Sequence, residues 1–129
     1  MVIDSSAFLA ILLDEPERPA FTSAIAADPV RLASAATLLE TSIVSLGRVG
    51  EAGLSELRSL FTTIGVETTP FGPDHIEVAI DAFRRFGKGR HPAGLNFGDC
   101  FSYALAKATG EPLLFKGDDF SQTDIQRAV

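Results

Sequence analysis

The chain has 129 residues, of which 46% are hydrophobic and 22% are charged, and this composition is typical of one globular domain over residues 1–129. Its net charge of −6 argues against a general nucleic-acid-binding protein. It has no long apolar run, no basic N-terminal segment, one cysteine and two histidines, so we expect no membrane span, no signal peptide, no internal disulfide and no zinc site.

Strand and helix signals alternate through the first half of the chain. In chain order they predict a strand at 2–3, a helix around 8–12, a helix from about 17 to 27, a strand at 30–33, a helix after Ser34, and a helix at 51–64. Gly47 and Gly50 mark the end of the helix that Ser34 caps, and Gly65 marks the end of the next helix.

The same alternation continues in the second half. It predicts a strand at 66–69, a helix from 73 to 86, a glycine-containing loop at 87–95, a helix from 96 to 110, a strand at 113–115 and a polar tail. Alternating strands and helices favour a parallel sheet with helices on both faces. We therefore expect an α/β fold, a three-layer α/β/α sandwich around a mainly parallel sheet of four to five strands.

Acidic residues follow the first and the last predicted strand. Asp4 comes directly after the first strand, and Asp118 and Asp119 come shortly after the last. In open α/β sheets, ligand sites lie beyond the carboxyl ends of the strands. Simpler interpretations remain open, because Asp4 can cap the next helix and Gly-Asp-Asp-Phe is a common surface turn.

Two more acids lie on predicted helices. Glu40 shares a helix face with Ala36 and Ile43, and a carboxylate among apolar neighbours is costly unless it is paired or ligated. Asp99 lies in the first turn of the most apolar helix, where it can complete a capping box with Asn96. That helix looks buried almost all round, so its charge should face a cavity or a partner. An exposed position for Glu40 and a purely capping role for Asp99 are the alternatives.

Together the acidic positions indicate a metal site. A parallel sheet brings strand ends and helix starts to one edge, and carboxylates gathered there repel one another without a counter-ion. A hard divalent cation relieves this repulsion, and all-oxygen ligation suits Mg²⁺ or Mn²⁺. Such ions polarise a phosphodiester and generate hydroxide from bound water, so we expect phosphodiester hydrolysis.

Basic residues are concentrated just before the Asp99 helix. Of the 11 lysines and arginines, four lie within seven positions and His91 follows them: Arg84, Arg85, Lys88 and Arg90. On their own they are compatible with a solvated helix end, where positive charge is favourable. Phe86 and Phe97 nearby are candidates for stacking on bases, although a place in the core is the simpler expectation.

Four segments carry motifs that stand in a fixed order along nearly the whole chain. They are Met-Val-Ile-Asp-Ser-Ser-Ala at 1–7, Ala-Thr-Leu-Leu-Glu at 36–40, the glycine-rich segment ending in Leu-Asn-Phe-Gly-Asp-Cys at 87–100, and the segment containing Phe-Lys-Gly-Asp-Asp-Phe at 113–125. In these segments the chain resembles the PIN-domain ribonucleases, and within them the VapC toxins of type II toxin–antitoxin modules. The two last-named strings resemble one VapC subgroup in particular.

The resemblance implies roles for the acids. Asp4, Glu40 and Asp99 would bind metal, with Asp4 and Asp99 as direct Mg²⁺ ligands. In this chain the spacing of the acids departs from the family pattern Thr-x-Asp-x-x-Phe. Asp119 is therefore preferred as the fourth catalytic acid, and Asp118 is the alternative, as a metal ligand.

Further roles follow from the same resemblance. Ser6 and Asn96 would hold the carboxylates. The loop before the Asp99 helix could hold substrate phosphates. The residues expected to contact RNA are Arg84, Lys88, Arg90, His91 and Lys116.

As a whole, the resemblance implies a Mg²⁺-dependent endoribonuclease, with Mn²⁺ as the alternative ion, that cleaves tRNA, rRNA or mRNA. It would be the toxin of a VapBC-type module, a homodimer in a bacterial or archaeal cytoplasm. A VapB-type antitoxin would cover the site, insert an Arg or Lys into it and bind the surface formed by residues 8–25 and 38–57.

Two other interpretations stay open. One is a non-catalytic PIN binding module, which the complete set of acids disfavours. The other is a receiver-like phosphoacceptor domain, which would need a middle strand ending in Asp. A P-loop enzyme is excluded, because the chain has no P-loop motif.

Overall fold

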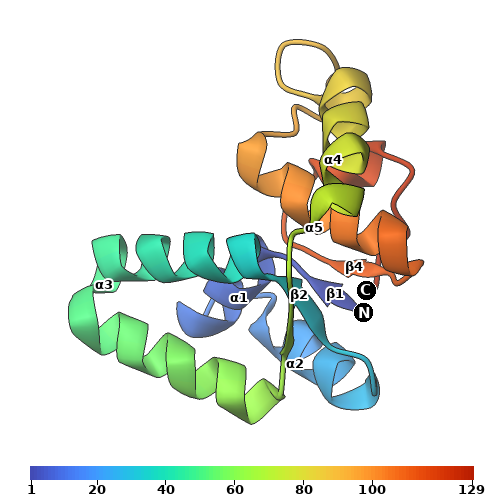
Figure 1. Cartoon of the computed structure of the whole chain (residues 1–129). Helices are drawn as coiled ribbons and strands as arrows, with labels where there is room; N and C mark the ends of the chain where they lie inside the picture. Colours follow the sequence, from blue (N-terminus) through green and yellow to red (C-terminus); the bar gives the residue numbers. More distant parts are fainter.

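The structure, a computed structural model, describes residues 1–129 and places helices on both faces of a small parallel sheet (Figure 1). The elements in chain order are β1 (Val2–Ile3), α1 (Ser5–Leu12), α2 (Arg18–Ala27), β2 (Leu32–Ser34), α3 (Ala35–Ile64), β3 (Glu67–Thr69), α4 (Pro73–Phe86), α5 (Phe97–Thr109), β4 (Leu113–Leu114) and a 3₁₀ turn at Phe120–Gln122. None of the helices is both long enough and apolar enough to span a membrane.

The sheet has the strand order β3-β2-β1-β4, and all of its pairings are parallel. Val2 lies opposite Leu32 on one side and opposite Leu113 on the other, so β1 is central. The chain builds outward from β1 to β3 and then places β4 on the opposite side of β1. The carboxyl ends of β1 and β4 therefore form the point where strand order reverses, which is where open α/β sheets bind ligands.

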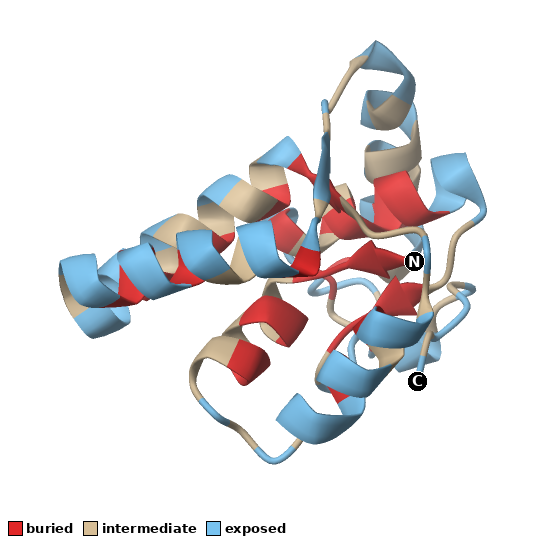
Figure 2. Cartoon of the chain, turned by 90° about the horizontal axis from the view of Figure 1, so that it is seen from below, coloured by how far each residue is buried: buried red, intermediate tan, exposed pale blue.

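Successive residues of the central strands face opposite helix layers, because side chains alternate across a pleated strand. Ile3 and Leu114 pack into a core with α1, α2 and the second half of α3. Val2 and Leu113 pack into a separate core with α4 and α5. Figure 2 shows β1 and β4 in the buried colour, while the edge strand β3 and the outer faces of the helices are largely exposed. The expected three-layer α/β/α sandwich is confirmed, with four strands.

The long helix α3 is a hairpin of two helical arms (Figure 1). Gly50 interrupts it with φ 77° and ψ −163°, in a conformation that only glycine adopts without strain. The predicted break is thus confirmed at Gly50, while Gly47 remains inside the first arm. The second arm buries Leu57 in the core, and the first arm carries Glu40 along the edge where the strands end.

Helix caps fix how α1, α3 and α5 begin at that edge, and the caps predicted there are confirmed. Asp4 accepts a hydrogen bond from the N–H of Ser6 at the start of α1, and Ser34 accepts one from the N–H of Ala36 at the start of α3. Asn96 and Asp99 form a reciprocal capping box at the start of α5. Because the strand-to-helix connections are this short, the acids at helix starts stay close to the sheet edge.

Candidate active site

Asp4 is the buried centre of the candidate site, with 3% of its surface exposed. Its Oδ2 accepts hydrogen bonds from the N–H of Ser6 at 2.9 Å and from the Ser6 hydroxyl at 2.6 Å. Its Oδ1 accepts one from the Ser102 hydroxyl at 2.6 Å. Asp4 thus caps a helix and also presents a carboxylate held on both oxygens, and no basic side chain forms an ion pair with it.

Glu40 reaches this region from the first arm of α3. Its side chain lies against Gly98 at the start of α5, where a Cβ atom would stand 2.7 Å from Glu40 Cδ. Burial raises the pKa of Glu40, the charge of Asp4 raises it further, and a hydrogen bond from Ser5 opposes both. The Glu40 carboxylate is therefore half-buried and is affected by the charge of Asp4. It does not lie on an outer, exposed stripe of the helix.

Asp99 comes from the first turn of α5. Its Oδ2 accepts a hydrogen bond from the N–H of Asn96 at 2.7 Å. Burial raises the pKa of Asp99 to about 7; the Asn96 hydrogen bond opposes this shift, and the charges of Asp4, Asp119 and Glu40 add to it. The structure thus brings these four carboxylates close enough to act on one another, with Asp119 rather than Asp118 among them.

No lysine or arginine forms an ion pair with any of these four acids. No three Asp, Glu, His or Cys side chains are arranged so as to surround a metal ion by themselves. Mg²⁺ commonly binds through one or two carboxylates and keeps several waters. An all-oxygen, negatively charged set with no counter-ion of its own therefore fits a hydrated divalent cation.

The basic residues expected to contact RNA fall into two groups. Arg84 forms an ion pair with Asp81 at 3.1 Å. Lys116 Nζ lies 2.7 Å from a carboxylate oxygen of Glu15 and 3.2 Å from one of Glu17. These two cations are already partnered.

The loop between α4 and α5 carries the other group. Lys88 and Arg90 are exposed and form no ion pair, and the Arg90 guanidinium lies 5.9 Å from the centre of the Phe83 ring. His91 accepts a hydrogen bond from the N–H of Ala93 through Nδ1 and packs edge-on against Phe86. Two free positive charges thus remain in the loop that leads into the Asp99 helix.

The position of Phe97 differs from the one predicted from the sequence. We expected a core position, but 80% of its surface is exposed, because its ring faces the open spaces beside α3 and α4 that no other element fills. Its ring lies edge-on against Phe101, with the ring centres 4.8 Å apart. Phe86 is half-buried. An exposed aromatic ring therefore stands two residues from Asp99.

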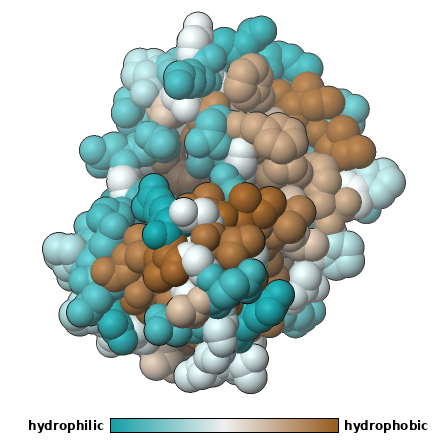
Figure 3. Space-filling view, turned by 90° about the vertical axis from the view of Figure 1, so that its left-hand side faces the viewer, coloured by the Kyte–Doolittle hydropathy of each residue, from teal (hydrophilic) through white to brown (hydrophobic).

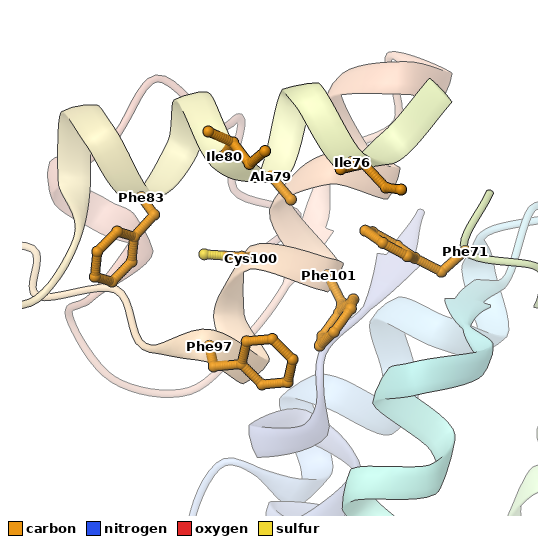
Figure 4. A pocket seen from close by; sticks show the side chains of 8 residues that line it. All are labelled: Phe71, Ile76, Ala79, Ile80, Phe83, Phe97, Cys100 and Phe101. Carbon is orange, nitrogen blue, oxygen red and sulfur yellow. The ribbon is translucent and has the colours of Figure 1, made fainter. Parts of the chain in front are cut away.

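Phe97 and Phe101 separate two apolar grooves. The smaller groove, of about 360 Å³, runs along the first arm of α3 and includes Glu40; its other lining residues are Ala36, Leu39, Ile43, Val44, Phe97, Gly98 and Phe101. The larger groove, of about 570 Å³, lies between α4 and α5 and is apolar throughout (Figure 4); it is lined by Phe71, Ile76, Ala79, Ile80, Phe83, Phe97, Cys100 and Phe101. Figure 3 shows broad apolar areas on the α3 side of the molecule.

Three residues close to the acids were missed by the sequence analysis. Ser102 and Thr37 are fully buried and connected to Asp4, and Gly98 makes room for Glu40. Their spacing carried a signal, because Ser102 is one helical turn after Asp99 and Thr37 is one turn before Glu40. A polar residue one turn from an acid, on an otherwise apolar helix, indicates a shared polar environment.

We expect Gly98→Ala to reduce the activity of this site by about tenfold or more, because its methyl group would overlap with the Glu40 carboxylate and displace it. Gly47→Ala is the matched control, since Gly47 is also a helical glycine and nothing lies within 4 Å of an added Cβ. Gly47→Ala should keep full activity and stabilise the protein by about 0.5–1 kcal/mol. Rates and thermal unfolding of both variants test this, and equal activities would contradict the role given to Gly98.

Comparisons of the chain with known proteins all indicate the same family. The family model of the PIN domain matches residues 1–126. The chain is 51% identical over 125 residues to ribonuclease VapC30 of Mycobacterium tuberculosis, covering 97% of this chain and 95% of the relative. It is 53% identical over 125 residues to ribonuclease VapC of Mycolicibacterium smegmatis, covering 97% of each chain.

Among solved structures, the fold is similar to that of Mycobacterium tuberculosis VapC20, described as a toxin that cleaves the sarcin–ricin loop. The TM-score is 0.77 at 19% sequence identity, covering 96% of this chain and 95% of the other. At that identity the match shows the shared fold. It agrees with the parallel sheet and the two helix layers described above.

Proposed function

The chain belongs to the PIN-domain family and groups with its VapC ribonucleases, and on that premise we propose that it is a Mg²⁺-dependent endoribonuclease, the toxin of a VapBC-type module. The observation that carries the proposal is the cluster of Asp4, Glu40, Asp99 and Asp119, four interacting carboxylates without a basic partner at the carboxyl edge of the sheet. We expect its substrate to be a loop or single-stranded part of tRNA, rRNA or mRNA in a bacterial cytoplasm.

Asp4 and Asp99 would hold the cation, with Mn²⁺ as the alternative ion. When bound, the cation supplies Lewis-acid polarisation of the phosphate and a nucleophilic water at neutral pH. Burial and the charge of Asp4 raise the pKa of Glu40, which would make its carboxylate a stronger base toward the attacking water than an exposed glutamate. Lys88 and Arg90 would bind RNA phosphates, and Phe97 would stack on an unpaired base.

The direct test is to incubate the purified protein with tRNA and with total RNA in Mg²⁺, in Mn²⁺ and in chelator. We expect discrete cleavage products with either ion and none with chelator. Cleavage that persists unchanged in chelator would contradict the metal-dependent mechanism. Metal-dependent cleavage of one RNA class alone would identify the substrate.

We propose the smaller groove as the antitoxin site. It pairs apolar side chains with Glu40, so it suits an antitoxin segment that combines apolar residues with an Arg or Lys. Leu39 and Ile43 are about 60% exposed, at 62% and 61%, and lie on the first arm of α3. Leu54, within the range first expected to bind the antitoxin, is only 9% exposed, so it offers little to a partner.

We propose that a second copy of the chain covers the larger groove. That groove contains no charged residue to receive a cationic side chain, and Ile76 and Ile80 in its lining are each 45% exposed. Burying such a surface against an identical surface is typical of homodimers, whose interfaces are more apolar than transient ones. The two grooves meet at Phe97, so each partner would lie close to the acids.

These assignments predict that two equivalent substitutions have different consequences. Ile43→Asp should weaken antitoxin binding by about tenfold or more while leaving the chain dimeric, because it replaces an apolar contact in the smaller groove with a carboxylate that must lose its water when the antitoxin covers it. Ile80→Asp should shift the chain toward monomers, because it buries a charge in the apolar groove. Sedimentation and antitoxin titration of both variants provide the test. If Ile43→Asp produced monomers and Ile80→Asp weakened antitoxin binding, the two assignments would be reversed.

A further inference from the structure

Two hydroxyls to which the sequence analysis assigned no role form a short hydrogen-bonded chain that ends on the Asp4 carboxylate. We propose that Ser102 and Thr37 are positioning residues, a buried pair that orients Asp4 so that one of its oxygens is presented to a divalent cation. This inference deepens the proposed function and rests on it. Neither residue would touch the cation or the RNA.

The hydrogen bonds of this pair have a defined direction. Ser102 Oγ lies 2.6 Å from Asp4 Oδ1 and 3.2 Å from Thr37 Oγ1, and both hydroxyl residues are fully buried. A serine hydroxyl has a single hydrogen, and Ser102 donates it to the carboxylate, which has none to give. Thr37 must therefore donate to Ser102, so the chain of donors runs from Thr37 through Ser102 to Asp4.

The other oxygen of Asp4 is held in the same way. The N–H of Lys116 donates to Ser6 Oγ at 3.0 Å, and Ser6 donates to Asp4 Oδ2 at 2.6 Å. With the further bond from the N–H of Ser6, Asp4 accepts three hydrogen bonds. A carboxylate has about four positions that can accept a hydrogen bond or bind a cation, and the protein fills three of them in Asp4. The direction of the remaining position is therefore largely fixed.

The pair also joins the two helices that carry the other acids. Thr37 lies one turn before Glu40 on α3, and Ser102 lies one turn after Asp99 on α5. Their hydroxyls meet across 65 residues of sequence and against the end of β1. The hydrogen bonds that orient Asp4 therefore also set how closely α3 and α5 approach at the acid cluster.

Stability alone does not distinguish a structural role of these hydroxyls from a positioning role. Removing one of them leaves a buried partner without its hydrogen bond, and this lowers stability whichever role the hydroxyl has. Groups that orient a metal ligand from behind, in contrast, typically change metal affinity by about 10–100-fold when they are removed. Affinity for the cation, rather than thermal stability, therefore distinguishes the two roles.

The test is the Mg²⁺ affinity of the RNA-free protein, measured by titration calorimetry beside thermal unfolding. We expect Ser102→Ala to weaken affinity by about tenfold and Thr37→Val by several-fold, whereas Thr37→Ser, which keeps the hydroxyl, stays within about twofold of wild type. Thr41→Val is the matched control. Thr41 is equally buried on the same arm, but its hydroxyl donates to the Thr37 carbonyl and does not point into the chain of donors.

The outcomes separate this inference from the proposed function. If Asp4→Asn binds Mg²⁺ as well as wild type does, the proposed site and this inference both fail. If Asp4→Asn loses binding while Ser102→Ala and Thr37→Val match Thr41→Val, the proposed site stands and the positioning role is overturned. If Ser102→Ala does not fold, the comparison of Thr37→Val with Thr37→Ser decides: a difference in affinity supports the role, and equal affinities overturn it.

Discussion

Asp99→Asn is expected to reduce RNA cleavage by roughly 10³-fold, equivalent to about 4 kcal/mol, and at the same time to stabilise the metal-free protein. The activity falls because the cation loses a charged ligand. Stability rises because burial and three neighbouring acids raise the pKa of Asp99 to about 7 in the folded protein. Above that pH the folded protein carries an unfavourable charge that asparagine removes.

The sign of the stability effect follows from proton linkage. The pKa of Asp99 in the folded state lies above its ordinary value of 3.8, so the folded state holds this proton more tightly than the unfolded state. The stability that this proton contributes is present at low pH and is lost as the pH rises toward 7. At pH 8, Asp99→Asn should be more stable than wild type by on the order of 1 kcal/mol, or roughly 4 °C.

Asp74→Asn is the matched control for this prediction. Asp74 also lies in the first turn of a helix, α4, but it is exposed and is not among the charges that act on Asp99. It should keep full activity and lose about 0.3–1 kcal/mol, because an acid at a helix N-terminus is favourable. Thermal unfolding with chelator and cleavage with Mg²⁺ give both readouts. A loss of stability in Asp99→Asn would contradict the repulsion among the acids.

The second large effect is a rise of cleavage with pH. Below pH 7 the Asp99 carboxyl is increasingly protonated and cannot bind a cation, so at limiting Mg²⁺ the rate should increase up to about tenfold per pH unit and level off above about pH 7. A bound cation favours the ionised form. Raising the Mg²⁺ concentration should therefore move the whole profile to lower pH.

The two adjacent acids of the last loop provide a matched pair for this experiment. Asp119→Asn should shift the profile to lower pH, because the charge of Asp119 contributes to the raised pKa of Asp99. Asp118→Asn should leave it in place. Rates measured between about pH 5.5 and 8.5 test both statements. A rate that falls with pH through this range would be incompatible with Asp99 as a metal ligand.

Local sequence signals predicted much of the fold. Asp4 and Ser34 were recognisable as caps because each is a short acceptor side chain directly before a helical pattern. Gly50 was recognisable as a break because it stands between two apolar periodicities. The acid cluster was predictable because a parallel sheet brings strand ends and helix starts to one edge, which places Asp4, at the end of β1, near Asp99, at the start of α5.

Long-range packing decided what the sequence could not predict. Ser102 reaches Asp4 across 98 residues, and Lys116 reaches Glu15 across 101, so no local pattern pairs them. Phe97 has the periodicity of a core residue, and its exposure depends on the open space that the folded chain leaves beside α3 and α4. The choice between Asp118 and Asp119 depends on the path of the loop after β4, for which the spacing to Phe120 was ambiguous.

The most direct test of the central claim is anomalous diffraction from crystals of the protein soaked in Mn²⁺. We expect an anomalous peak with carboxylate oxygens of Asp4 and Asp99 at about 2–2.5 Å from the ion, and no peak at this place in crystals of Asp4→Asn. A peak elsewhere on the molecule, or none at a Mn²⁺ concentration that supports RNA cleavage, would contradict the account. The predicted peak would establish that these acids at the edge of the sheet hold the ion.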